Sequence, residues 1–534
     1  MEKRALLAIG LAFIILLVYQ FFFIPPQPVQ TLPQTATEDR QLQPATVEDG
    51  MDSMYPALPT AETPAPQTAL IGGEDIRVET PLYSAAFSSK GANIRHFQLK
   101  HFKDKEGNNV VILNDPKGKP PLSIGSKKEL ELADAMFTVS RHDLKLDKDK
   151  QRGSLVFTYR ARGISVKRTY TFSSDSYKID IRDEVSGLSD YLITIGADFG
   201  IHEKEGFYTH VGPVLLKEAD RIEFTADKFD EPESYSEQLK WIALEDKYFF
   251  ASLVPVSPVK EAKVWKQDDA LMIGLRGSPG VNDFILYAGP KEYDTLKSLN
   301  IGLEHIVDFG FFSILAIPLF WLLKFFYQMT GNYGWAIILV TFILRIPFIP
   351  LINKSQRSMK KMQEIQPKMA EVKEKHKKDP QKMNKEMMGL YKKHKVNPVG
   401  GCLPMLLQIP FFFALYKILL ISIELRGAPF MLWINDLSAP DTLFGHIPAS
   451  IPLIGGFALG PLPILMGATM IIQQKMTPTS LDPTQNRLMM LMPIVFTFLF
   501  LNFASGLVLY WLMNNLFSII QQFFANRKLA KEKS

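Results

Sequence analysis

The sequence contains one cysteine, Cys402, among 534 residues. A single thiol excludes an internal disulfide framework. No glycine-rich phosphate-binding pattern of the P-loop type is present, so the sequence does not point to nucleotide-driven chemistry. Acidic residues are also scarce in the long apolar runs of the second half, where Glu424 stands at the outer end of one run. This scarcity argues against a proton-coupled pump, because such pumps usually carry intramembrane carboxylates.

The chain is 47% hydrophobic and 22% charged, but long uncharged runs alternate with densely charged ones, which is typical of a membrane protein with soluble parts. The first run, Ala5–Ile24, follows two basic residues, and its 20 residues span about 30 Å, the thickness of a hydrocarbon core. The alternative is a signal peptide, but the run is long for one and no small-x-small cleavage site follows. We therefore predict an uncleaved transmembrane anchor at 1–24 with its amino terminus in the cytoplasm.

Residues 25–68 are rich in Pro, Gln and Thr and predict a flexible linker. From Ala69 the pattern changes. Ser154–Phe172 indicates two strands joined by a turn at Arg162-Gly163, and Tyr177–Val185 alternates apolar and charged residues. Many short strands of this kind predict an all-β sandwich domain over 69–300. Because this domain follows a cytoplasm-to-outside anchor, we expect it outside the cytoplasm.

Phe311–Gly331 is apolar but is interrupted by Pro318 and Lys324. We predict an amphipathic interfacial helix within 301–332 rather than a span, because a span here would reverse the orientation of every later segment. Gly445–Gly460 is too rich in Pro and Gly to span, and we expect an outer loop that touches the membrane surface. Residues 333–534 contain five further predicted spans, which with the anchor make six transmembrane helices: Tyr333–Ile352, Cys402–Ile423, Leu459–Gln474, Leu488–Phe503 and Gly506–Phe523.

The loop 353–395 carries 14 basic and 5 acidic side chains, a net charge of +9, so the positive-inside rule places it and the carboxyl terminus in the cytoplasm. Asp379-Pro380 is typical of a helix start. Helical spacing of apolar residues predicts a hairpin whose two helices meet along Met359, Met362, Met369 and Val372 and along Met383, Met387 and Leu390. The lysines either only set the topology or form a docking surface for anionic lipid headgroups, ribosomal RNA or a protein. The candidate docking residues are Lys360, Lys361, Lys368, Lys377 and Lys378.

Arg345 is the thirteenth residue of the span Tyr333–Ile352, about 10 Å from its cytoplasmic end. An arginine near the bilayer centre costs about 2.5–3.5 kcal/mol. Either the side chain reaches toward the inner headgroups, or it lies in a hydrated cavity within the bundle. In such a cavity an uncompensated positive charge would attract acidic groups of a passing chain. Candidates to line the cavity are Thr341, Gln408, Ser422, Asn502, Ser505, Asn514 and Ser518.

Four stretches resemble the YidC/Oxa/Alb family of membrane protein insertases: Asn397–Leu419, Pro429–Asp441, Pro463–Phe500 and Ser505–Gln522. The similarity covers about 301–534 with long, specific motifs, and the preceding regions resemble the Gram-negative form more weakly. The resemblance implies a five-span core with a hydrophilic groove that is open to the cytoplasm and to lipid but closed outside. It assigns the groove charge to Arg345. It also points to Tyr510 and Trp511. Together with four of the cavity candidates, they complete the predicted groove: Thr341, Gln408, Ser505 and Asn514. Where bacterial members often have two tyrosines, this chain has Tyr510-Trp511, which puts a role for the second hydroxyl in doubt.

The resemblance also implies a β-supersandwich for the β domain, a bacterial inner-membrane location with both termini in the cytoplasm, and a functional monomer. The function expected is that of an insertase and chaperone without a cofactor, not that of an enzyme. Its implied partners are nascent membrane proteins, the Sec translocon, the ribosome and anionic phospholipids.

Two other functions agree less well with the sequence. A solute transporter or channel would be favoured by inverted repeats or paired intramembrane charges, and the sequence shows neither. A membrane-tethered carbohydrate enzyme might use His202, Glu203, Glu205 and His210, but their spacing fits no standard zinc motif, and isolated surface residues explain them better.

Overall fold

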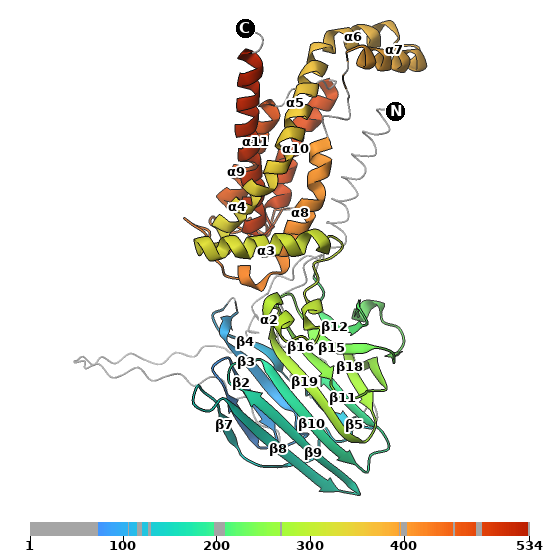
Figure 1. Cartoon of the computed structure of the whole chain (residues 1–534), viewed down its shortest axis with the longest axis vertical. Coiled ribbons are helices and arrows are strands. Elements are labelled where there is room, and N and C mark those ends of the chain that lie inside the picture. Colours follow the sequence, from blue (N-terminus) through green and yellow to red (C-terminus); the bar gives the residue numbers. More distant parts are fainter. Residues whose placement is uncertain are drawn as a thin grey trace, which may run out of the picture. The chain divides into compact units, whose positions relative to one another are not determined.

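The computed structural model describes residues 73–104, 106–114, 120–126, 130–196, 209–267, 270–394, 396, 403–451, 454–476 and 483–531 (Figure 1). The predicted anchor at 1–24 and linker at 25–68 lie outside these residues, as does Cys402. The described residues from Glu74 onward belong to one compact unit, in which a β-rich part precedes a helical part.

The β-rich part forms three sheets, and their neighbouring strands are antiparallel except for the parallel pair β1–β7. The first sheet has the order β4 (Asn109–Asn114), β3 (Ile94–Lys103), β2 (Tyr83–Ser88), β1 (Asp75–Glu79) and β7 (Asp143–Lys145). The second has the order β13 (Asp220–Glu223), β12 (Gly212–Lys217), β15 (Leu239–Glu245), β16 (Phe249–Pro255), β19 (Gly280–Pro290), β10 (Lys178–Ser186), β9 (Ile164–Ser173), β8 (Arg152–Ala161) and β6 (Thr138–Val139). The third has the order β14 (Glu233–Tyr235), β17 (Glu261–Gln267), β18 (Ala270–Gly277), β11 (Tyr191–Gly196) and β5 (Ile124–Gly125).

Two local predictions for this part are confirmed. β8 and β9 pair with Ala161 opposite Ile164, so the turn consists of Arg162 and Gly163. Both turn residues have positive φ, 54° and 78°, as a two-residue hairpin turn with the right-handed strand twist requires. In β10 the alternation also holds, since Ile179 and Ile181 are buried while the charged residues that flank them are not: Lys178, Asp180 and Arg182.

The buried face of β10 continues with a charged residue, Asp183, which pairs with Arg168 on the neighbouring strand β9. Both side chains are 0% exposed. The Arg168 guanidinium donates to Asp183 Oδ1 and Oδ2 at 2.8 and 2.6 Å, and Tyr191 donates its hydroxyl to Oδ2 at 2.6 Å. Arg168 Nη1 also donates to the carbonyl of Leu122 at 2.6 Å. The ion pair is therefore fully buried and hydrogen-bonded on both sides, as a buried charge requires.

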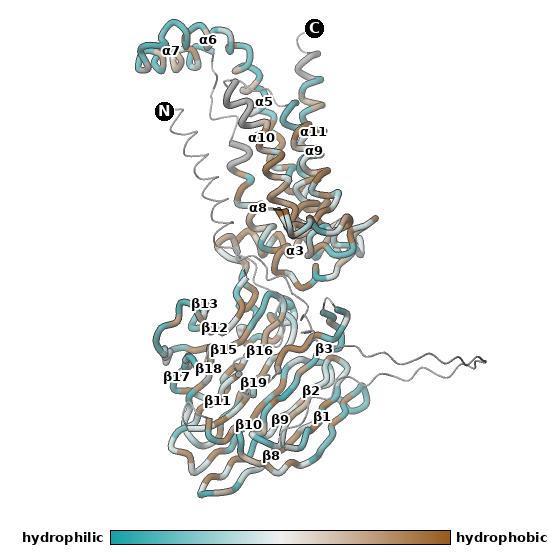
Figure 2. The backbone as a smooth tube through the Cα atoms, turned by 180° about the vertical axis from the view of Figure 1, so that it is seen from behind, coloured by the Kyte–Doolittle hydropathy of each residue, from teal (hydrophilic) through white to brown (hydrophobic). Residues whose placement is uncertain are grey.

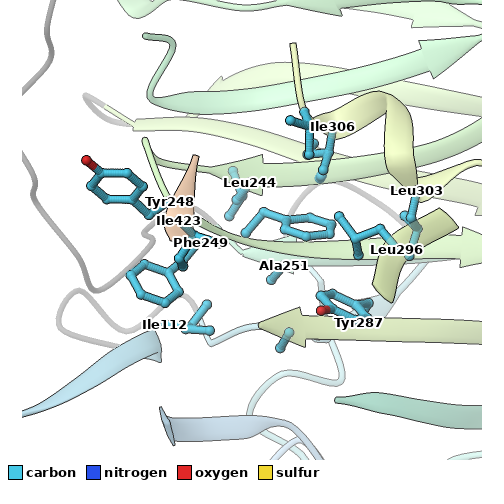
Figure 3. Close-up of a cluster of buried hydrophobic side chains, with 14 of the residues drawn as sticks. Ile112, Leu244, Tyr248, Phe249, Ala251, Tyr287, Leu296, Leu303, Ile306 and Ile423 are labelled. Carbon is cyan, nitrogen blue, oxygen red and sulfur yellow. The ribbon is translucent and has the colours of Figure 1, made fainter. Parts of the chain in front are cut away.

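The chain after β19 returns to the domain core. Helix α2 (Tyr293–Ser298) and the 3₁₀ turn η2 (Leu303–Ile306) bury Leu296, Leu303 and Ile306. Figure 3 shows these side chains gathered around Ala251 and Tyr287 of the second sheet. The other short turn of the β-rich part, η1, covers Ala226–Lys228. The segment after the last strand is thus packed into the core and is not a free connection.

The helical part contains at least one helix at the position of each of the five predicted spans. They are α4 (Tyr333–Arg345) with η3 (Ile346–Phe348) and α5 (Ile349–Glu364), then α8 (Leu403–Ile421) with η5 (Ile423–Leu425), α9 (Pro461–Met476), α10 (Pro483–Phe500) and α11 (Ser505–Lys531). By length and composition, three helices in the described ranges could cross a membrane: Ser313–Thr330, Tyr333–Glu364 and Ser505–Arg527. Two shorter apolar helices, Leu407–Ile421 and Met490–Phe500, accompany them.

Helix α3 (Ser313–Thr330) is long enough to span but has two different faces. Leu319 and Leu323 are buried, while Ile314 and Trp321 are 83% and 66% exposed. Lys324 Nζ lies 2.5 Å from Oδ2 of Asp294, which is in the first turn of α2. α3 also runs crosswise to α4 and α11 (Figure 1). These features support the interfacial helix that the sequence predicts, and its position in a membrane stays a prediction.

The basic loop contains three helices rather than two, because α5 continues out of the bundle into it. α6 (Gln366–Lys375) follows after a break at Ile365, with a proline in its first turn, and α7 (Pro380–Lys393) packs against α6. The predicted helix start at Asp379 is confirmed, since its side chain accepts from Lys382 N at 3.0 Å. The buried cluster between these helices contains four of the seven predicted seam residues: Met362, Met369, Met387 and Leu390. Ile365, Tyr391 and Val396 complete it, while Met359, Val372 and Met383 lie outside it. Figure 2 shows α6 and α7 mainly hydrophilic and α10 mainly hydrophobic.

Candidate functional site

Arg345 is the last residue of α4, where the chain changes from an α-helix to the 3₁₀ turn η3. Pro347 and Pro350 follow it, and proline lacks the N–H that would continue the α-helical hydrogen bonds. The local sequence therefore interrupts the helix directly after the arginine. A short 3₁₀ segment of this kind within a long helix often marks a functional position.

The Arg345 guanidinium is bound on all three of its nitrogens by neutral groups of α11. Nη1 donates to the Asn514 side-chain and backbone oxygens, both at 2.9 Å, and Nε and Nη2 donate to Gln521 Oε1, both at 3.2 Å. Gln521 Nε2 in turn donates to Asn353 Oδ1 on α5 at 3.1 Å. Among the residues that the structure describes, no carboxylate forms an ion pair with Arg345. The charge is thus held in position without being neutralised.

Arg345 borders two cavities. The smaller, about 30 Å³, lies among α4, η3, α8 and α11, and the larger, about 410 Å³, lies between α4–α5 and α11. The smaller cavity is therefore large enough for water but not for a peptide segment. The smaller cavity is where most of the predicted groove residues meet.

Five of the seven predicted groove residues line this smaller cavity: Thr341, Arg345, Gln408, Tyr510 and Asn514. The other two lie elsewhere. Ser505 is at the start of α11 and donates to the Ala439 carbonyl at 2.8 Å, nine residues or about 13 Å from Asn514 along the helix axis. Trp511 packs its ring 5.0 Å from that of Phe412 and 5.1 Å from that of Phe500, so it belongs to an aromatic cluster between helices.

Three further polar residues considered as cavity lining do not border either cavity. Asn502 accepts from the backbone N–H of Ala458 at 2.9 Å, Ser518 donates to the Asn514 carbonyl at 2.8 Å, and Ser422 is buried beyond the end of α8. The first two satisfy backbone groups, which is a common task of small polar side chains in membrane bundles. These three candidates therefore do not line the two cavities beside Arg345.

Sequence reasoning missed Gln521 and Asn353. Gln521 lies 176 residues from Arg345 in the chain, so no local pattern connects the two. The available signal was its spacing from Asn514, since residues seven apart on a helix share a face. This spacing predicts Gln521 on the same face of the helix as Asn514.

The predicted docking lysines lie on or next to the helices of the basic loop. Lys361, Lys368, Lys377 and Lys378 are exposed and Lys360 is half-buried. Because the interior of the α5–α7 cluster is apolar, these lysines are available on its outside. The structure leaves their docking role a prediction.

The residues named for the carbohydrate-enzyme alternative are described only in part. His202, Glu203 and Glu205 lie outside those ranges. His210 is described, and its Nε2 lies 2.9 Å from the Pro213 carbonyl. No group of three or more metal-ligating side chains occurs in the part of the chain that the structure describes.

Comparisons with known proteins agree with the arrangement of a β-rich part followed by a helical part. A family model described as the YidC periplasmic domain matches residues 75–322, and one described as the 60Kd inner membrane protein matches residues 325–532. A membrane protein insertase YidC from Geotalea daltonii is 40% identical over 553 residues, which cover 99% of this chain and 100% of that one. The protein of the same name from Citrifermentans bemidjiense is 39% identical over 569 residues, with coverage of 99% and 100%. The chain therefore belongs to the YidC family of membrane protein insertases.

Proposed function

We propose that this protein inserts nascent proteins into the bacterial inner membrane and helps them fold, by drawing a polar segment of the client into the space beside Arg345. The observation that carries the proposal is the guanidinium held by Asn514 and Gln521 without an acidic partner among the described residues. Membership of the insertase family supports the activity, and this hydrogen-bond pattern supports the site.

The electrostatic attraction between Arg345 and an acidic client is large enough to affect the rate of insertion. A carboxylate about 4 Å from the guanidinium gains about 1 kcal/mol in bulk water and about 4 kcal/mol at an effective dielectric constant of about 20. The hydrogen bonds to α11 fix the guanidinium before the client arrives, so binding the client costs little further side-chain entropy at Arg345. The attraction offsets part of the cost of removing an acidic group from water. Burial of the apolar client segment in lipid then drives its release.

The arginine does not simply reach toward the headgroups, in this proposal, since all three of its nitrogens are bound to α11. The smaller cavity of about 30 Å³ is too small for a peptide segment. Client entry therefore requires α8 to move away from α4 and α11. In that open state Gln408, Thr341 and Tyr510 would face the client.

The proposed arrangement in the membrane has six spans with both termini in the cytoplasm. It comprises an anchor at 1–24, a linker at 25–68, a β-supersandwich at 69–300 on the periplasmic side, an interfacial helix at 301–332 and an insertase core at 333–534. The net charge of +9 on the loop 353–395 supports the cytoplasmic side for that loop. The lysines of the loop would recruit the ribosome, anionic phospholipids and the client. The protein would act as a monomer, alone or beside the Sec translocon. The transporter or channel alternative has no support from the relatives, which are named insertases.

The test is reconstitution of the full chain in liposomes without ATP, with a one- or two-span client that has an acidic outer segment. Arg345→Ala should slow insertion by about fivefold to about 900-fold, because this range corresponds to a loss of about 1–4 kcal/mol. Arg345→Lys should retain most of the insertion activity. A client with a neutral outer segment should respond to neither variant. The matched control is Arg160→Ala, which removes an exposed guanidinium from β8. Normal insertion of the acidic client by Arg345→Ala would refute the role of the charge.

A further inference from the structure

The larger cavity beside Arg345 has a second arginine and more amide side chains in its walls than the smaller one. Its walls include Arg345, Asn353, Gln356, Arg357 and Gln521, and none of its twelve lining residues carries a negative charge. With two guanidinium groups and three amides, this cavity of about 410 Å³ has the composition of a site for an anion with further polar groups.

The apolar residues of the same cavity point to an amphiphile rather than a free anion. Phe342, Ile346, Ile520 and Phe524 line it and are 51%, 49%, 51% and 62% exposed. In a membrane protein such exposed apolar side chains contact lipid chains. The cavity is thus open along a lipid-facing edge between α4–α5 and α11.

The order of these residues along α4 and α5 matches the order of groups in a phospholipid. Phe342 and Ile346 lie toward the membrane centre, while Asn353, Gln356 and Arg357 lie beyond them. Arg357 is 12 residues after Arg345, about 18 Å along the helix axis. With the loop 353–395 in the cytoplasm, as proposed above, the polar end lies at the headgroups of the inner leaflet and the apolar end at the acyl chains.

An unpartnered atom narrows the choice of headgroup. Gln356 Oε1 is buried and has no hydrogen-bond partner among the described residues. A buried acceptor without a donor costs about 1–3 kcal/mol. Because Gln356 lines the cavity, a ligand hydroxyl there favours rotation of its amide toward the ligand. A zwitterionic headgroup would bring its ammonium into a cavity that already holds two guanidinium groups. An anionic headgroup with hydroxyls satisfies both the charge and the acceptor.

We propose that the cavity between α4–α5 and α11 binds one anionic phospholipid of the inner leaflet, with its phosphate at Arg357 and a headgroup hydroxyl donating to Gln356. The acyl chains lie along Phe342, Ile346 and Ile520. This proposal rests on the membrane orientation given under the proposed function. It places a lipid next to Arg345 on the side away from the smaller cavity, where the client is expected.

The test is native mass spectrometry of the full-length protein in detergent, titrated with phosphatidylglycerol, phosphatidic acid or phosphatidylethanolamine. We expect one saturable phosphatidylglycerol per chain, bound about tenfold more tightly than phosphatidylethanolamine, since charged hydrogen bonds contribute about 1.5–3 kcal/mol. Arg357→Gln should weaken both anionic lipids about tenfold. Gln356→Leu should weaken phosphatidylglycerol but spare phosphatidic acid, which has no headgroup hydroxyl beyond its phosphate. Lys354→Gln is the control, because Lys354 is an exposed cation of α5 that does not line the cavity.

Equal losses in Arg357→Gln and Lys354→Gln would overturn the proposal, since binding would then follow the overall positive charge of the loop. Equal affinity for phosphatidylethanolamine would overturn it as well. Displacement of phosphatidylglycerol by an acidic peptide, with the same dependence on Arg357 and Gln356, would assign the cavity to the client instead. Lipid binding is measured without a client, so a negative result there does not affect the insertion test of Arg345→Ala. A negative insertion test likewise does not affect the measurement of lipid binding.

Discussion

The buried ion pair between Arg168 and Asp183 makes a strong prediction about the stability of the β-rich part. Asp183→Asn keeps the size of the side chain but removes its charge. The guanidinium of Arg168, which is 0% exposed, then loses two charge-assisted hydrogen bonds of 2.8 and 2.6 Å. Among the residues that the structure describes, no other anion forms an ion pair with it. Removing one partner of a buried pair costs about 3–5 kcal/mol, because the other charge stays buried without compensation.

That free energy can be expressed as a change in hydrogen exchange. β9 and β10 are interior strands of the nine-stranded sheet, each paired on both sides, so we expect their amides to exchange only when this part unfolds. At about 1.4 kcal/mol for each factor of ten, the protection of these amides should fall about 150- to 4000-fold in Asp183→Asn. The measurement is exchange mass spectrometry of the full-length protein in detergent, read on peptides from the two strands.

A matched control lies one residue further along the same strands. Lys167 and Glu184 face each other in the same register and form an ion pair of 3.0 Å, but their side chains are 49% and 42% exposed. Glu184→Gln should therefore cost no more than about 1 kcal/mol, or about fivefold in protection. Comparing Asp183→Asn with Glu184→Gln separates the effect of burying the ion pair from the effect of removing a carboxylate charge.

Two outcomes decide the argument. The double variant Arg168→Met with Asp183→Leu removes both charges and should recover most of the lost protection, since apolar replacement of a buried pair is often neutral or stabilising. If Asp183→Asn lowers protection by less than about fivefold, similar to Glu184→Gln, the buried pair does not carry the stability assigned to it. If the double variant is no more stable than the single one, the loss comes from something other than an uncompensated charge.

Two smaller changes test local packing and capping. Gly334→Ala would place a methyl group against the ring of Phe430, so it should destabilise the bundle by about 1–3 kcal/mol in thermal unfolding. The control is Gly389→Ala in α7, where the added methyl group meets open space and should stabilise the protein by about 0.5–1 kcal/mol. Equal effects of the two variants would show that the close contact with Phe430 is unimportant. Asp379→Ala removes the side chain that accepts from Lys382 N, and should cost about 1 kcal/mol, seen as faster hydrogen exchange in the first turn of α7 but not in α5. Asp379→Asn should restore most of the protection, and its failure to do so would argue against a capping role.

Features that depend on neighbouring residues were readable from the sequence. The β8–β9 turn at Arg162-Gly163, the alternation in β10 and the helix start at Asp379 each follow from residues within a few positions of one another. The apolar runs likewise located the helices of the bundle. The break at Ile365 did not follow from the sequence pattern, and three of the seven predicted seam residues lie outside the buried cluster.

The sequence by itself thus determined the order of the parts, most of the secondary structure and the position of an arginine at the end of an apolar helix. Only the tertiary structure decided which groups hold that arginine, since Gln521 and Asn514 lie 176 and 169 residues away in the chain. It also decided that Trp511 packs among aromatic rings while its neighbour Tyr510 borders the smaller cavity. The physical reason is that helix and strand formation depend on spacing along the chain, whereas a buried charge is compensated by whichever polar groups the packing of distant helices brings within about 3 Å.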